Sequence, residues 1–318
     1  MSYLERKQIN KKTYAYFVKK ISFMKNIHII KKHIGIDSSA ITKEKYLLDN
    51  LEYLSNEEFN FRKKFLRQIK EKVSHNEQLP EKIEIKAIEI NNLNEGKKCH
   101  EFLDIEFAKE FIFNSNNIEG SKIPPEKVRE IIDSGETKYQ NKNEIKEVKN
   151  SIKAFDYLKK SFKFNLSSIK RLYYILTKDL VMEGGGPYPR GFKKAQNVVG
   201  NSLTTPPEKV EKELKELINW YRKNKDKIHP LILAFEFHIK YEYIHPFLDG
   251  NGRTGRLIMN KILMSGGYSP MIIYKKNKLS YFNSIEKSRE GKLENYYQFM
   301  LEKADESYDY LLKVLEKY

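Results

Sequence analysis

Residues 245–256, which read HPFLDGNGRTGR, form a short loop between two segments that both have a helical period. Apolar residues recur every three or four positions in residues 230–243 and again in residues 257–263, which predicts a helix on each side of the loop. Pro246 and Gly250 end the first helix. The loop therefore leads into the N-terminus of a helix, where free backbone N–H groups and the positive end of the helix dipole favour an anion.

The composition of this loop suits a phosphate group. Gly250, Gly252 and Gly255 allow the backbone N–H groups to turn inward around an anion. Arg253 and Arg256 add charged donors that match phosphate oxygens. We therefore expect a phosphate-bearing ligand at the start of the second helix.

Two further side chains of the loop are suited to chemistry on such a ligand. Asp249 offers a carboxylate to Mg²⁺, which proteins usually hold with one or two carboxylates together with the phosphates of a substrate. His245 is the only side chain of the loop that titrates near neutral pH. The loop thus combines a candidate metal ligand with a candidate general base.

Commoner phosphate and metal motifs do not explain the loop. Its glycines satisfy G-x-G-x-x-G, but the segment before them has the period of a helix and not of a strand, which excludes a dinucleotide-binding unit. A P-loop would need lysine at Arg256 and serine or threonine at Leu257. A calcium loop would need an oxygen ligand where Arg253 stands.

The whole loop matches the signature H-x-F-x-[DE]-G-N-G-R-x-x-R at every defined position, and the chain therefore resembles the Fic family. The resemblance implies a helical bundle that moves AMP from ATP onto a hydroxyl of a protein. It implies that His245 deprotonates the target hydroxyl and that Asp249 holds Mg²⁺. The residues that it assigns to the phosphates of ATP are Gly250, Asn251, Gly252, Arg253, Thr254, Gly255 and Arg256, with Arg256 at the γ-phosphate.

A second motif lies more than a hundred residues earlier. Ser115 and Glu119 are four residues apart, hence on one face of a predicted helix near residues 105–120, and Gly120 suits its end. The pattern resembles the [ST]-x-x-x-E-[GN] motif of Fic proteins that carry an N-terminal inhibitory helix. A glutamate at a helix C-terminus is unfavourable beside the negative end of the dipole, so we expect a cationic partner, namely Arg256. The alternative is a surface glutamate at a helix end.

Residues 187–206 break the helical period with proline, glycine and asparagine around a short β-prone run. The segment resembles the hairpin flap of Fic proteins. The resemblance implies that the edge of the flap holds the backbone of a target protein by strand addition. The candidate residues are Asn197, Val198, Val199 and Gly200. An ordinary surface hairpin is the alternative.

The remaining segments complete a mainly α fold, a Fic-type helical bundle with a β-hairpin flap and a small N-terminal β-hairpin. Residues 12–35 predict that N-terminal hairpin, and the alternation in residues 82–92 predicts a short strand or an extended connection. We expect an accessory region over residues 1–95 and a Fic domain over residues 96–318. Helical periods are found in residues 42–73, 125–132, 143–161, 167–182, 207–223, 279–290 and 293–317.

Composition narrows the environment and the partners. The 318 residues carry a net charge of +16, but the lysines are scattered over amphipathic helices, so we do not expect nucleic acid as the partner. The single cysteine, Cys99, indicates a reducing compartment. No apolar run reaches the length of a membrane span. These features predict a soluble, cytoplasmic protein without a membrane partner.

Three functions follow from these observations. The first is an autoinhibited protein adenylyltransferase that uses ATP and Mg²⁺ to modify tyrosine, serine or threonine hydroxyls. Self-modification is expected, because the chain has 21 tyrosines. The second is removal of AMP from a modified protein, with Glu119 acting on water, alone or together with the forward reaction. The third is a basic module that binds nucleic acid or another ligand without catalysis.

Overall fold

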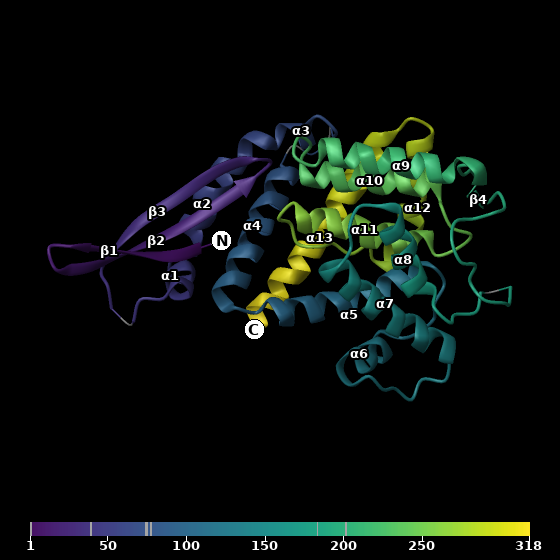
Figure 1. Cartoon of the computed structure of the whole chain (residues 1–318), viewed down its shortest axis with the longest axis horizontal. Coiled ribbons are helices and arrows are strands. Elements are labelled where there is room, and N and C mark those ends of the chain that lie inside the picture. The colour runs from purple at the N-terminus through teal and green to yellow at the C-terminus, as the bar shows by residue number, and fades with distance from the viewer. Residues whose placement is uncertain (1, 39, 74–75, 77, 183, 201) are drawn as a thin grey trace.

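The computed structural model of the chain describes residues 2–38, 40–73, 76, 78–182, 184–200 and 202–318. Most of this part is helical (Figure 1), as predicted. No helix of the described part is long and apolar enough to cross a membrane. The helices are α1 (Lys43–Asp49), α2 (Leu51–Arg62), α3 (Arg67–Lys70), α4 (Leu79–Lys97), α5 (His100–Ile118), α6 (Pro125–Ser134), α7 (Lys142–Lys160), α8 (Leu166–Thr177), α9 (Pro207–Asn224), α10 (Pro230–Ile244), α11 (Asn251–Ser265), α12 (Lys278–Arg289) and α13 (Leu293–Lys317).

The N-terminal region contains the predicted hairpin and one further strand. Strands β1 (Ser2–Ile9), β2 (Lys12–Phe23) and β3 (Asn26–Ile36) form an antiparallel sheet in the order β1-β2-β3. Inward-facing residues of the sheet pack against α1 and α2 in a small core of their own, which contains Phe17, Ile21, Ile30, Leu47 and Leu54. Most of the buried side chains of the sheet come from β2, which therefore contributes most to holding the sheet against these helices.

Helix α4 corrects the prediction of a strand at residues 82–92. The helix stands between the N-terminal region and the remaining helices, and it packs against α1 and α2 on one side and α13 on the other (Figure 1). The apolar alternation does not follow burial on this helix, because Ile85 is exposed while Glu84 and Lys86 are buried and paired. The expected domain boundary at residue 95 falls inside this helix.

The main core surrounds α10, which is buried on nearly all sides and packs against α9 and α11. This explains why α10 is apolar almost throughout. Helices α5, α7 and α8 pack around α11. Helix α8 ends at Thr177, earlier than the predicted end near residue 182. The connection between α10 and α11 is the glycine-rich loop, so both sides of that loop are anchored in the core.

The predicted flap is present as a small hairpin between α8 and α9. Strand β4 (Val198–Val199) pairs antiparallel with β5 (Ser202–Leu203). Val198 and Leu203 are exposed. The flap therefore presents a short strand edge to the surroundings.

Candidate active site

His245 is turned out of the end of α10 by its backbone. It occupies the C-cap of the helix with φ 49° and ψ 63°, and its N–H donates to the carbonyl of Tyr241 at 2.9 Å. A left-handed conformation costs a residue other than glycine about 1 kcal/mol, and such strain is common at functional sites. The conformation leaves the imidazole partly exposed, at 16%. The imidazole thus faces a cavity and is not buried in the helix.

Asn251 and Phe247 hold the loop in shape. The Asn251 side chain accepts from the Phe247 N–H and donates to the Phe247 carbonyl, both at 2.8 Å. The Phe247 ring stacks on the Tyr173 ring with centroids 3.8 Å apart. Asn251, which we predicted to bind phosphate, is itself buried, so only its backbone is free for a ligand. Side chains of the core therefore fix the positions of the loop N–H groups.

The start of α11 has the form of an anion site. Gly250 caps the helix with φ 79°, a conformation that glycine adopts without strain. The first hydrogen bond within the helix runs from Thr254 N to the Gly250 carbonyl at 3.2 Å. The N–H groups of the residues before Thr254 therefore have no acceptor within the helix. The backbone at Asn251 and Gly252 therefore offers donors to a phosphate.

Thr254 and Gly255 lie on the buried side of α11, so we leave them out of the proposed phosphate site. Thr254 is fully buried, and its Oγ1 donates to the Gly250 carbonyl at 2.8 Å. A Cβ at Gly255 would lie 2.6 Å from an oxygen of Glu242. Both residues thus allow α11 to pack closely against its neighbours.

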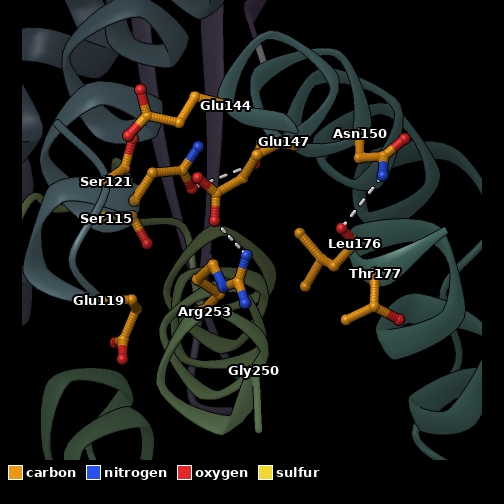
Figure 2. A network of polar contacts seen from close by, with 12 residues as sticks. Ser115, Glu119, Ser121, Glu144, Glu147, Asn150, Leu176, Thr177, Gly250 and Arg253 are labelled. Atoms are coloured by element: carbon orange, nitrogen blue, oxygen red, sulfur yellow. Dashed lines mark hydrogen bonds and ion pairs between the residues drawn. The ribbon is translucent and has the colours of Figure 1, made fainter. Parts of the chain in front are cut away.

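Arg253 is held by a glutamate that the sequence did not reveal. Its guanidinium forms an ion pair with Glu147 of α7, as Figure 2 shows, and it also donates to the Tyr188 hydroxyl at 3.2 Å. Burial raises the pKa of Glu147 by more than Arg253 lowers it. Glu147 belongs to a helix about a hundred residues away in the chain, so no local pattern marks it. The two contacts thereby hold the guanidinium of Arg253 beside the first turn of α11.

Asp249 fits a site for Mg²⁺ that the substrate would complete. Its carboxylate is exposed, accepts from the Gly250 N–H at 2.5 Å, and accepts from the Tyr188 hydroxyl at 2.8 Å. A carboxylate has about four acceptor positions, so others remain free. The described residues contain no group of three or more histidine, cysteine, aspartate or glutamate side chains suited to a metal. One carboxylate together with phosphate oxygens is a usual set of ligands for Mg²⁺.

Arg256 is buried and forms the predicted pair with Glu119. Its Nη2 donates to Glu119 Oε1 at 2.7 Å and to the Ser115 carbonyl at 2.9 Å, and its Nε donates to Ser115 Oγ at 3.1 Å. Glu119 is the C-cap of α5, so the cation meets it at the negative end of that helix. A Cβ at Gly252 would lie 2.2 Å from Glu119 Oε1. A side chain at this position would therefore displace the Glu119 carboxylate from its place beside Arg256.

A cavity of about 340 Å³ adjoins these groups. His245, Glu119 and Arg256 line one part of it. The other walls come from the flap and from α12, through Val198, Val199, Gly200, Tyr281, Phe282, Ile285 and Glu286. The residues of α12 were missed because a helix with a regular apolar period gives no sign of a ligand. The volume is within the range of small-molecule sites.

Lys193 ties the flap to the loop. Its Nζ donates to Asn197 Oδ1 at 2.7 Å, to Thr204 Oγ1 at 2.6 Å and to the Ile244 carbonyl at 3.3 Å. Burial lowers the pKa of Lys193 to about 8. Asn197 Nδ2 also donates to the Phe247 carbonyl at 3.0 Å. The side chain of Asn197, one of the predicted flap residues, thus anchors the flap from within.

Comparisons with known proteins place this site in a family. The sequence profile of the Fic/DOC family matches residues 163–263, a range that contains the flap and the whole glycine-rich loop. These residues form a Fic domain. Ser115 and Glu119 lie before the matched range, so the pair with Arg256 joins the Fic domain to the helix that precedes it.

Named relatives and solved structures agree with this assignment. Protein adenylyltransferase Fic of Drosophila mojavensis is 28% identical over 214 residues, which cover 63% of this chain and 40% of the relative. The protein of that name from Nematostella vectensis is 30% identical over 204 residues, which cover 62% of this chain and 47% of the relative. The chain thus spans less than half the length of these curated relatives.

Two crystal structures share the Fic fold. A Fic domain containing signaling protein from Bacteroides thetaiotaomicron has a TM-score of 0.60 and 22% identity, with 68% of this chain and 90% of that chain covered. A Fic family protein from Desulfovibrio desulfuricans has a TM-score of 0.60 and 23% identity, with 73% and 74% covered. The helical bundle around the Fic loop is therefore the fold of the family.

Proposed function

We propose that the protein is an autoinhibited protein adenylyltransferase that transfers AMP from ATP to a hydroxyl of a protein. The observation that carries the proposal is the meeting of His245, the start of α11 and Arg256 at one cavity. A base, an anion site and a cation are the groups that nucleotidyl transfer requires. The names of the relatives support the same reaction.

The reaction would need little more than positioning and charge. The phosphates of ATP would accept from the N–H groups of Asn251 and Gly252, beside Arg253. The target oxygen would attack the α-phosphorus in line with the leaving pyrophosphate, forming one P–O bond as the other breaks. His245 would take the proton of the hydroxyl. Asp249 would hold Mg²⁺, which neutralises phosphate charge when bound.

The apolar part of the cavity suits a nucleotide base. Val199, Phe282 and Ile285 provide apolar walls. Glu286 accepts from Ser202 Oγ at 3.2 Å through Oε2, while its buried Oε1 has no hydrogen-bond partner among the described residues. A buried carboxylate oxygen without a donor is unfavourable, and the amino group of adenine would supply one. We therefore assign this part of the cavity to the base of ATP.

The flap would hold the target. Backbone N–H and C=O groups of a two-residue strand can pair with an extended segment of another protein. Val198 is exposed at that strand. Strand addition at this edge would place a tyrosine, serine or threonine hydroxyl beside His245, including one from a second copy of the chain.

The Glu119–Arg256 pair would keep the enzyme inactive at rest. Arg256 is the expected partner of the γ-phosphate, and its guanidinium is bound to Glu119 and Ser115. ATP would then bind with its phosphates poorly aligned for in-line attack. Removal of the Glu119 carboxylate would free the arginine. A module that binds a ligand without catalysis would not need His245, Asp249 and Arg256 together, and all three are present at this site.

The chemistry is tested by labelling with ATP that carries the label on the α-phosphate. The Glu119→Gly variant should label itself or proteins of a lysate. The variant Glu119→Gly/His245→Ala should lose at least about 100-fold in rate, since general-base help is typically worth 10²–10⁴-fold. Equal labelling by both variants would exclude His245 as the base.

Removal of AMP from a modified protein is a second candidate. Glu119 and His245 line the same cavity, so the glutamate could orient a water molecule toward the phosphorus of AMP-modified target. The two functions differ in the effect of one substitution. If the enzyme also removes AMP, the wild type should release AMP from the modified target, and Glu119→Gly should abolish this release while raising AMP transfer. If the enzyme only transfers AMP, the wild type should show no release.

A further inference from the structure

Glu242 is a buried carboxylate directly behind His245. It lies on α10, three residues before the histidine, and its side chain is 7% exposed. Glu242 Oε2 is 3.7 Å from His245 Nδ1, an ion-pair distance that is longer than a hydrogen bond. Within the described part of the chain, neither His245 Nδ1 nor Glu242 Oε1 has a hydrogen-bond partner. The Glu242 carboxylate and the His245 ring thus face each other where little solvent reaches them.

The surroundings keep this carboxylate ionised. Burial raises the pKa of Glu242, but its neighbours, His245 first among them, leave that pKa below its ordinary value. Burying an ionised carboxylate is costly unless charged or hydrogen-bonding groups compensate. Arg256, a permanent cation, and His245 are the groups around Glu242 that provide this compensation.

We propose that Glu242 is the positioning residue of the base, holding a proton on Nδ1 of His245 so that Nε2 faces the target hydroxyl. This inference rests on the proposed adenylyl transfer. The tautomer of a histidine is set by the partner of its other ring nitrogen. A carboxylate at Nδ1 also stabilises the imidazolium that forms when Nε2 accepts the proton. Contacts between catalytic groups are often long before the substrate binds, so 3.7 Å allows this role.

Residues of α10, α11 and α12 surround Glu242 and keep its carboxylate beside His245. His238 Nδ1 lies 3.9 Å from Glu242 Oε1, and burial lowers the pKa of His238 to about 4, so that ring is neutral near pH 7. His238 Nε2 lies 2.7 Å from the Tyr281 hydroxyl. Arg289 of α12 donates to the Glu242 carbonyl at 3.3 Å. Only glycine at position 255 leaves room for the carboxylate.

The test compares Glu119→Gly with Glu119→Gly/Glu242→Gln, so that the pair with Arg256 is absent from both proteins. We expect the glutamine variant to lower kcat by about 100-fold with KM for ATP unchanged, because the base and not the nucleotide site is affected. Glu242→Asp should recover part of the rate. Glu236→Gln on the same helix, where the glutamate pairs with Lys72 away from the cavity, is the matched control and should leave kcat unchanged.

Nitrogen-15 NMR of the histidine rings supplies a readout that does not need activity. In Glu119→Gly the Nδ1 resonance of His245 should be that of a protonated nitrogen, and Glu242→Gln should shift the ring toward the Nε2–H tautomer. An unchanged tautomer, or an unchanged kcat, overturns the role of Glu242. If Glu119→Gly shows no transfer at all, the proposed function fails, and the NMR comparison still decides whether Glu242 sets the tautomer.

Discussion

Arg256 and Glu119 are 137 residues apart in the chain and 2.7 Å apart in space. The arginine is 1% exposed, and its side-chain hydrogen bonds go to Ser115 and Glu119 of α5 and its C-cap. The glutamate side chain remains 23% exposed and lies at the cavity that also contains His245. One ion pair therefore joins α5, which precedes the range matched by the Fic/DOC profile, to α11, and it contains the cation that we expect to meet ATP.

Ser115→Ala should release part of the inhibition. Ser115 Oγ accepts from Arg256 Nε at 3.1 Å, and a hydrogen bond to a charged group is worth about 1.5–3 kcal/mol, much of which water can replace after truncation. We expect the rate of AMP transfer to rise severalfold, less than in Glu119→Gly. Ser121→Ala, at a nearby serine that instead donates to Glu144, is the control. Equal rates for Ser115→Ala and wild type would show that the hydroxyl does not hold Arg256.

Tyr188→Phe should raise the Mg²⁺ concentration that the reaction requires. The hydroxyl donates to Asp249 Oδ2 at 2.8 Å and orients the carboxylate. Without it, we expect the concentration of Mg²⁺ at half-maximal rate to rise about 10-fold, and excess EDTA should stop transfer by either protein. The measurement is a Mg²⁺ titration in the Glu119→Gly background. Tyr174→Phe is the control, and identical titrations for all three proteins would show that the Tyr188 hydroxyl does not orient a ligand of Mg²⁺.

Glu286 should select the base. If Oε1 accepts from the amino group of adenine, the Glu119→Gly enzyme should use ATP at least about 10-fold better than inosine triphosphate, which lacks that group. Glu286→Ala should reduce this preference. Steady-state kcat/KM for the two nucleotides gives the answer. A preference that persists in Glu286→Ala would assign base recognition to other residues.

Because of Lys193, the free energy of unfolding should rise as the pH becomes alkaline. Burial lowers its pKa to about 8, whereas an unfolded lysine has a pKa of about 10.4, so the unfolded chain binds more protons between these values. Stability must therefore rise with pH in this window relative to Lys193→Met. The gain should be about 1 kcal/mol between pH 7 and pH 9. Urea denaturation of both proteins measures it, and a constant difference would show that the lysine keeps its ordinary pKa.

The sequence predicted the parts of the site that are continuous in the chain. The loop from His245 to Arg256 and the pair of Ser115 and Glu119 each follow a local pattern, and the bundle follows from the helical periods. Glu147, Tyr188 and the α12 wall of the cavity depend on packing between distant helices, which a single sequence does not show.

Buried charged residues misled the prediction at α4. Glu84 and Lys86 are buried in ion pairs while Ile85 is exposed, so the apolar and polar residues alternate without marking the two faces of a strand. The inward direction of the Asn197 side chain could not be predicted, because an asparagine in a turn looks the same whether it anchors the flap or lies at its edge.

The autoinhibition is tested most directly by the rate of AMP transfer in three proteins: wild type, Glu119→Gly and Glu119→Gly/Arg256→Ala. The contact removed is a partly buried charged hydrogen bond worth about 1.5–3 kcal/mol, so Glu119→Gly should be about 10-fold to 100-fold faster than wild type. The double variant should lose that gain, because the freed arginine is absent. Equal rates for wild type and Glu119→Gly, or full activity without Arg256, would contradict the account.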